Sequence, residues 1–119
     1  MYKVHFLLNS NGKSDSLEFI RSTAFKTDKQ SVVLSNKIND YITALSQYGL
    51  SLGEPFIKHL EDDIWELRPK NIRFLFGVKD DSFIILTYFA KKSRKTPRYE
   101  ILLAKKKWAD YLAEEKGNE

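Results

Sequence analysis

The N-terminal part of the chain begins with alternating residues and continues with an apolar face at helical spacing. Residues 1–8 read as a first strand, because the polar run from Asn9 to Gly12 follows directly. After it, Leu17, Ile20 and Ala24 recur every three or four positions. A serine at position 14 or 16 can cap this stretch, so we expect a helix to begin there.

A second helical stretch shows the clearer periodicity. It ends at Tyr48, and Gly49 follows where a helix C-terminus favours glycine. Its apolar face is formed by Leu34, Ile38, Tyr41, Ile42 and Leu45. The two stretches predict a helical hairpin with its joint at residues 25–29. Both apolar faces are interpreted as core, and neither implies a cofactor.

From Gly53 onward the hydrophobic period changes from helical spacing to strand patterns. Residues 54–60 predict a short edge strand, because Pro55 cannot donate to a ladder, and residues 64–68 alternate between apolar and polar. Pro69 ends that strand. Residues 72–78 and 83–90 predict two further strands joined by a turn at 79–82, and the second is apolar enough to be central.

The C-terminal segment predicts one more helix. Thr96 is suited to cap its start, Pro97 to occupy its first position, and Glu100 lies in its first turn. Its buried stripe is predicted to consist of Ile101, Ala104, Trp108 and Leu112. From Glu114 the polar tail is expected to be frayed.

These elements predict a single α+β domain over residues 1–119. The order is a strand, a helical hairpin, a run of strands and a C-terminal helix. Strands that follow one another without intervening helices pair antiparallel, so we expect a twisted antiparallel sheet of about four strands. We expect the helices to pack on one face of it.

Composition excludes several classes of protein. The 119 residues include no cysteine, which excludes disulfides and thiolate chemistry, and only two histidines, which disfavours a histidine-based metal site. No apolar run approaches the roughly 20 residues of a membrane span. The N-terminus lacks the long apolar region of a signal peptide. We therefore expect a cytoplasmic protein that has no metal and no membrane partner.

The positive charge is concentrated in one part of the chain. Residues 1–67 contain 7 Lys+Arg against 9 Asp+Glu, and residues 108–119 contain 1 against 4. Residues 68–107 contain 12 against 3. Such a basic segment suits a polyanion, above all nucleic acid, although lysines and arginines also solvate the outer faces of ordinary strands and helices.

The sequence lacks a phosphate-cradling glycine loop, a nucleophile elbow and a paired-histidine helix. Cations instead gather at strand ends. Arg68 closes one strand and Arg73 opens the next, so a short connection brings them close enough to share a phosphate. Further cations follow the apolar strand, at Lys91, Lys92, Arg94, Lys95 and Arg98.

Several ordered motifs resemble one known family. WELR at 65–68, IRFLF at 72–76 and LTYFAKKSRKTP at 86–97 are followed by Glu100, Ile101 and Ala104. Over residues 55–107 this pattern resembles the HigB-like, phage-derived Gp49-like branch of the RelE/ParE toxin superfamily. The resemblance implies the RelE-like fold and the toxin of a type II toxin–antitoxin pair. Most characterised HigB-like members cut messenger RNA on the translating ribosome.

The resemblance also implies partners and a metal-independent endoribonuclease chemistry without cofactors. The partners are the ribosome, mRNA and a HigA-like helix-turn-helix antitoxin, and operator DNA is reached only through the antitoxin complex. In such chemistry the ribose 2′-hydroxyl attacks the adjacent phosphate, and Arg68 and Arg73 would clamp the phosphoryl oxygens. Lys91, Lys92 and Lys95 would exchange protons, because crowded positive charge disfavours the ammonium form. Lys91 and Lys92 match the family motif. The sequence does not show which lysine acts as the general base and which as the general acid.

Six further residues are candidate RNA contacts, and each has a structural alternative. They are Arg94, Arg98, Tyr88, Tyr99, Lys105 and Lys106. Tyrosines in a strand or a first helical turn are also common core residues. Arg68 could pair with Glu66 or Asp63 instead of a phosphate, and His59 could be an acid or base but is more often a packed or surface residue.

The sequence also allows two other functions. The superfamily includes gyrase-directed toxins and members that have lost activity, so a non-catalytic protein-binding module is an alternative. Such a poison would depend on surfaces other than the basic cluster, for example the last helix. A stand-alone nucleic-acid binder would hold free duplex or RNA with strong salt dependence and without cleavage.

Overall fold

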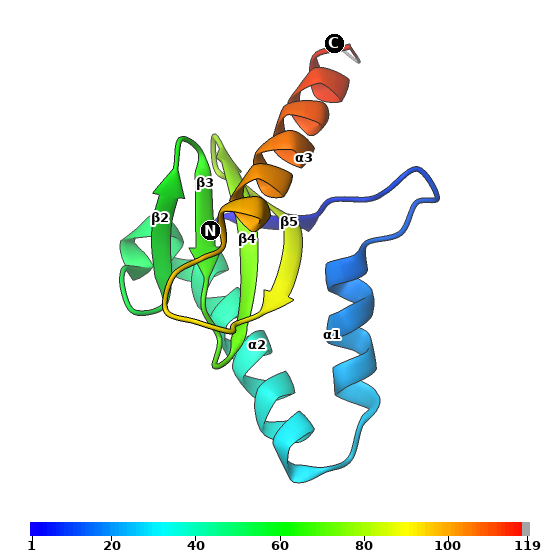
Figure 1. Cartoon of the computed structure of the whole chain (residues 1–119), viewed down its shortest axis with the longest axis vertical. Coiled ribbons are helices and arrows are strands. Elements are labelled where there is room, and N and C mark those ends of the chain that lie inside the picture. The colour runs from blue at the N-terminus through cyan, green and yellow to red at the C-terminus, as the bar shows by residue number, and fades with distance from the viewer. Residues whose placement is uncertain (118–119) are drawn as a thin grey trace.

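The computed structural model describes residues 1–117 of the chain, and Figure 1 shows the arrangement of their helices and strands. The N-terminal strand is followed by two helices and a short 3-10 helix, and four strands then lead to a long C-terminal helix. In chain order the elements are β1 (Lys3–Phe6), α1 (Asp15–Phe25), α2 (Lys29–Tyr48), η1 (Gly49–Leu52), β2 (Ile57–Glu61), β3 (Ile64–Leu67), β4 (Ile72–Lys79), β5 (Ser82–Ala90) and α3 (Arg98–Gly117).

All five strands belong to one sheet, in the order β1-β5-β4-β3-β2. The strands from β2 to β5 pair antiparallel with their chain neighbours, because short turns connect them. β1 instead lies parallel to β5, with Lys3 opposite Ser82 and Phe6 opposite Ile85. The predicted α+β class is confirmed. The sheet is mixed and has five strands, because the N-terminal strand extends it beyond the four antiparallel ones.

Helices cover both faces of the sheet. On one face, Ile38 and Leu45 of α2 pack with Phe74 and Phe76 of β4, and Phe19 of α1 lies against the same cluster. On the opposite face, α3 packs its own buried residues, Ala104 and Trp108, over Ile64, Leu75, Ile84 and Leu86. The prediction that all helices share one face was therefore wrong. Side chains alternate along a strand, and the central strands are apolar on both sides, so both sides need a cover.

The helix ends follow local chemistry. The Ser14 hydroxyl accepts a hydrogen bond from the Leu17 amide at 3.2 Å, which confirms a serine cap for α1. Gly49 has a positive φ of 60° at the end of α2. Two expectations were wrong. Ala24 is exposed, and α3 continues to Gly117 instead of fraying from Glu114, because that stretch contains good helix formers.

Candidate functional site

Residues 91–97 connect β5 to α3, and we call them the basic loop because four of their side chains are cationic. In Figure 1 this connection runs from the end of β5 across the view of β4 and β3 to the start of α3. Two hydrogen bonds attach it to the β3–β4 turn and to β3. The Lys91 amide donates to the Asn71 carbonyl at 2.7 Å, and the Thr96 hydroxyl donates to Glu66 Oε2 at 2.6 Å. The loop is thus held beside the β3–β4 turn, where both predicted phosphate clamps lie.

A buried carboxylate links the elements at this end of the sheet. Glu66 on β3 is only 2% exposed, and its Oε1 lies 3.3 Å from Arg68 Nε and 4.0 Å from Arg73 Nε. Its second oxygen accepts the bond from Thr96. A buried carboxylate is costly unless charges and donors offset it. Glu66 therefore joins Arg68, Arg73 and the basic loop in one cluster.

Arg68 is the more accessible of the two arginines. Its side chain is 22% exposed, and it forms the ion pair with Glu66 that the sequence allowed. The contact places two atoms close together, yet the buried Nε–H finds no hydrogen-bond partner among residues 1–117. Because the side chain is partly exposed, the guanidinium lies within reach of a ligand while its Nε side faces Glu66. Its planar fork suits two oxygens of a phosphoryl group.

Arg73 is held inside the protein. It is 6% exposed, and its Nη1 donates to the Lys70 carbonyl at 2.8 Å and to the Ile72 carbonyl at 3.0 Å. Burial lowers the pKa of the Arg73 guanidinium, Glu66 raises it, and Arg68 lowers it further. These bonds fasten the β3–β4 turn. A substitution at Arg73 would consequently disturb the fold together with any phosphate contact.

The exposed cations of the site are those of the basic loop. Lys91, Lys92, Arg94 and Lys95 are all exposed, and within residues 1–117 none of them forms an ion pair. Beside the loop, a groove of about 340 Å³ runs between β2 and the start of α3. Its lining includes the cations Lys58, Lys95 and Arg98 and the carboxylate Glu61. The loop and groove form a continuous surface with excess positive charge.

Other predicted RNA contacts are engaged within the protein. Arg98 and Lys105 both pair with Glu61, and Lys105 lies 3.0 Å from Asp62 as well. Lys106 pairs with Asp110 one turn along α3, and both side chains are mostly exposed. The hydrogen bonds to Glu61 and Asp62 raise the pKa of Lys105. The pairs with Glu61 and Asp62 fasten α3 to the β2–β3 hairpin, so an RNA would have to compete for the charges of Arg98 and Lys105.

The aromatic candidates occupy different environments. The Tyr88 ring stacks on Phe19, with ring centroids 4.4 Å apart, and packs against the core on the α1–α2 face. Tyr88 is therefore a core residue, which was the alternative to an RNA contact. Tyr99 is 65% exposed on α3 and free to stack on a base. His59 packs on Trp65, and its Nε2 lies 2.7 Å from the Asp62 carbonyl, so it stabilises the β2–β3 hairpin.

Comparison with known proteins identifies the family of the chain. The family model described as Phage derived protein Gp49-like (DUF891) matches residues 25–109. The chain belongs to that family. The match includes α2, the whole run from β2 to β5 and most of α3, and so contains Glu66, both arginines and the basic loop of this Gp49-like protein. A search of curated proteins found no match.

The fold also resembles a solved structure. A copper-bound mutant toxin from Helicobacter pylori aligns with a TM-score of 0.50 and 20% sequence identity. The alignment covers 76% of this Gp49-like chain and 94% of the other chain. At that identity the likeness shows a shared fold.

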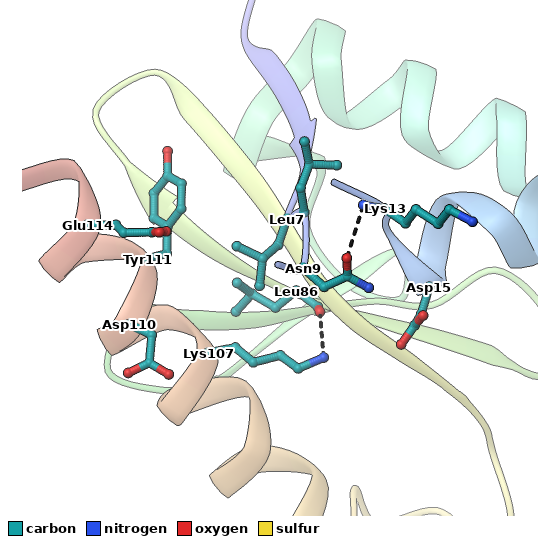
Figure 2. Close-up of a pocket in the computed structure, with 10 residues that line it drawn as sticks. Leu7, Asn9, Lys13, Asp15, Leu86, Lys107, Asp110, Tyr111 and Glu114 are labelled. Carbon is teal, nitrogen blue, oxygen red and sulfur yellow. Dashed lines mark hydrogen bonds between the residues drawn. The ribbon is translucent and has the colours of Figure 1, made fainter. Parts of the chain in front are cut away.

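A second cavity lies on the far part of α3 and has different chemistry. Figure 2 shows this space of about 230 Å³, where the Lys107 ammonium donates to the Leu86 carbonyl at 3.5 Å. Two lysines and three carboxylates line it, namely Lys13, Lys107, Asp15, Asp110 and Glu114. It contains none of the predicted site residues, and its excess of carboxylates disfavours a polyanion. The candidate site of the Gp49-like protein is therefore the basic loop.

Residues 1–117 form neither a metal-binding cluster nor a membrane-spanning helix. This part of the chain has no group of three or more His, Cys, Asp or Glu side chains that could hold a metal ion. Within the same range no helix combines the length and apolar character needed to cross a bilayer.

Two acidic residues of the site, Glu66 and Glu100, were not predicted as functional groups from the sequence. Glu66 was considered only as an ion-pair partner, because an alternating strand places a polar residue outside unless a second layer covers that face. Glu100 is partly buried in the first turn of α3. Burial raises the pKa of its carboxyl, while the nearby charges of Lys107 and Lys92 oppose that shift. A partly buried carboxyl near Lys92 is a further proton-transfer candidate.

The Glu61 cluster gives a pH-dependent prediction. Hydrogen bonds from Arg98 and Lys105 lower the pKa of Glu61 below its ordinary value. A lowered pKa means that the ionised carboxylate stabilises the fold above the unfolded-state pKa, and that this contribution is lost as pH falls through the folded-state pKa. Glu61→Gln should therefore have a lower Tm than wild type at pH 7, and the difference should shrink as the pH is lowered from 7 toward 3. Calorimetry across that range would test it, and a constant difference would contradict it.

Proposed function

We propose that this Gp49-like protein is the toxin of a toxin–antitoxin pair and cleaves messenger RNA on the translating ribosome. The observation that carries the proposal is the cluster in which Glu66 holds Arg68, Arg73 and an exposed basic loop together. The similar H. pylori protein is a toxin, which supports the toxin assignment. We place the protein in the cytoplasm, where ribosomes and mRNA are available.

The chemistry would use the RNA's own 2′-hydroxyl. Its oxygen attacks the adjacent phosphorus and forms the cyclic phosphate, while the bond to the 5′-oxygen breaks. The 2′ proton goes to a base, the 5′-oxygen receives a proton from an acid, and the phosphoryl oxygens need positive charge. Arg68 would supply the fork for those oxygens, with Arg73 behind it. Lys91, Lys92 and Lys95 would exchange the protons, or Glu100 would accept one of them.

The groove beside the loop offers a path for the rest of the RNA. Lys58, Lys95 and Arg98 line it, and phosphate contacts of this kind bind RNA without reading its sequence. Arg94 and Tyr99 lie exposed near the same edge. Lys105 and Lys106 lie about two turns further along α3 and would contact ribosomal RNA by charge.

An antitoxin partner follows from the proposed class. The α3 face formed by Tyr99, Leu102 and Leu103 is apolar and exposed, and these three residues fall at helical spacing. This face favours one alternative function as well, namely a non-catalytic toxin that binds a protein target. We assign it to a helix-turn-helix antitoxin of the HigA type, which would cover the nearby basic loop and carry the operator-binding activity.

Primer extension in a reconstituted translation mixture would test the proposal. Wild-type protein should cut a reporter message only when ribosomes are present. Lys91→Ala should lower the cleavage rate at least about 10-fold, because it removes a proposed proton-transfer group from an exposed position. Lys37→Ala, at an exposed position of α2 on the sheet face opposite α3, is the matched control and should cut normally. Intact message in a culture that nevertheless stops growing would reject the nuclease and direct attention to the α3 face.

A further inference from the structure

We propose that Glu66 and Thr96 form a latch that holds the basic loop in place beside Arg68, so that both act as positioning residues. The inference rests on the proposed function, since it concerns how that site is assembled. It adds two residues that do not touch the reacting atoms. Their effect would be exerted through Arg68 and the loop lysines.

The basic loop has few attachments of its own. Four positive charges within five residues repel one another and favour an open, variable loop. Ser93 bonds only within the loop, to the Lys95 carbonyl. At the β5 end the Lys91 amide binds the Asn71 carbonyl. At the α3 end, the Thr96 hydroxyl gives the single side-chain hydrogen bond from the loop to a strand within residues 1–117.

The acceptor of that bond is unusually well placed. Glu66 is fixed on β3 between its neighbours β2 and β4, and at 2% exposure its carboxylate has little competition from water. A short hydrogen bond from a hydroxyl to an ionised carboxylate is among the stronger kinds. Thr96 was predicted to cap α3, yet its hydroxyl donates to the Glu66 carboxylate instead. The chain therefore uses this threonine to anchor the loop.

The same carboxylate orients the arginines from its other oxygen. Glu66 Oε1 faces Arg68 Nε at 3.3 Å and Arg73 Nε at 4.0 Å. One side chain thus sets the distance between the arginine fork and the loop lysines. A misplacement of about 1 Å between reacting groups can cost around 100-fold in rate. Loss of the latch should accordingly lower kcat more than it weakens RNA binding.

Thr96→Val removes the hydroxyl and keeps the side-chain shape, whereas Thr96→Ser keeps the hydroxyl. We expect Thr96→Val to lower kcat for ribosome-dependent cleavage about 10-fold to 100-fold with KM changed less than about 3-fold. Thr96→Ser should restore most of the rate. Glu66→Gln should also lower kcat, because it removes the charge that orients Arg68. Thr27→Val, an exposed threonine between α1 and α2, is the control for the substitution itself.

Amide hydrogen exchange on the same proteins gives a readout that does not need activity. Thr96→Val should speed exchange in residues 91–97 and leave α2 protected. If Thr96→Val and Thr96→Ser both cleave like wild type, or if the valine variant loses rate without faster loop exchange, the latch is rejected. If wild type itself cuts no message, the proposed function fails. Amide hydrogen exchange alone then tests the latch, and unchanged exchange of residues 91–97 in Thr96→Val would reject it.

Discussion

Arg68→Ala is expected to lower the rate of ribosome-dependent mRNA cleavage by about 100-fold to 1000-fold, the usual cost of removing one donor from a developing oxyanion. Arg68 directly follows β3, is partly exposed, and is held by Glu66 at 3.3 Å from its Nε. Arg73, in contrast, is bound to the Lys70 and Ile72 carbonyls. The loss should fall on kcat, because the phosphoryl oxygens gain charge only in the transition state.

Two variants separate the phosphate-binding role of Arg68 from a general effect of positive charge. Arg68→Lys keeps the positive charge and loses the planar fork, so its rate should lie between those of Arg68→Ala and wild type. Arg21→Ala removes an exposed arginine of α1 and should cleave normally. Circular dichroism melts would show whether each variant is folded at the assay temperature. Cleavage by a folded Arg68→Ala protein within about 3-fold of wild type would contradict a role in transition-state stabilisation.

Local elements of the fold could be predicted because their causes are local. The three-and-four spacing in residues 34–45 predicted α2 and Gly49 marked its end, while Ser14 is the one of two candidate serines that caps α1. Alternation predicted β3, and the proline at position 55 precedes an edge strand. Each of these patterns depends on residues that are close in the sequence.

The arrangement of the elements depends on distant residues, and it was only partly predicted. Nothing in residues 1–8 shows that β1 pairs parallel with β5, about 80 positions away. That α3 covers the second face follows from Ile64, Leu75 and Ile84 being apolar on the side opposite α2. A continuous apolar run such as β5 does not show which layer covers which side.

The site shows the same division between local and distant causes. The motifs identified Arg68, Arg73 and the loop lysines, and the structure brings them together through Glu66. Their catalytic roles stay predictions. The partners of Arg98 and Lys105 could not be anticipated, because Glu61 lies about 40 residues earlier on β2. A charge count therefore overstated how much of the basic segment is available to RNA.

Trp108→Ala is expected to reduce the free energy of unfolding by about 3–5 kcal/mol, the usual cost of removing a large buried aromatic side chain. Trp108 is 6% exposed, lies in the α3 core cluster and stacks on Tyr111 with ring centroids 5.5 Å apart. A loss of this size is a large part of the 5–15 kcal/mol typical of a domain. Urea unfolding would measure it, and Leu102→Ala, at an exposed position of α3, should change stability by less than about 1 kcal/mol.

Gly77 on β4 leaves the space that the Trp108 ring occupies. A Cβ at this position of β4 would overlap the Trp108 ring, so Gly77→Ala should destabilise wild type by about 1–3 kcal/mol through overpacking. In a Trp108→Ala background that ring is gone, and the same alanine should cost little, because its Cβ then occupies the space left by the indole. The double-mutant cycle should give a coupling of at least about 1 kcal/mol. Additive effects would show that Gly77 is required for its backbone and not for the close approach of α3.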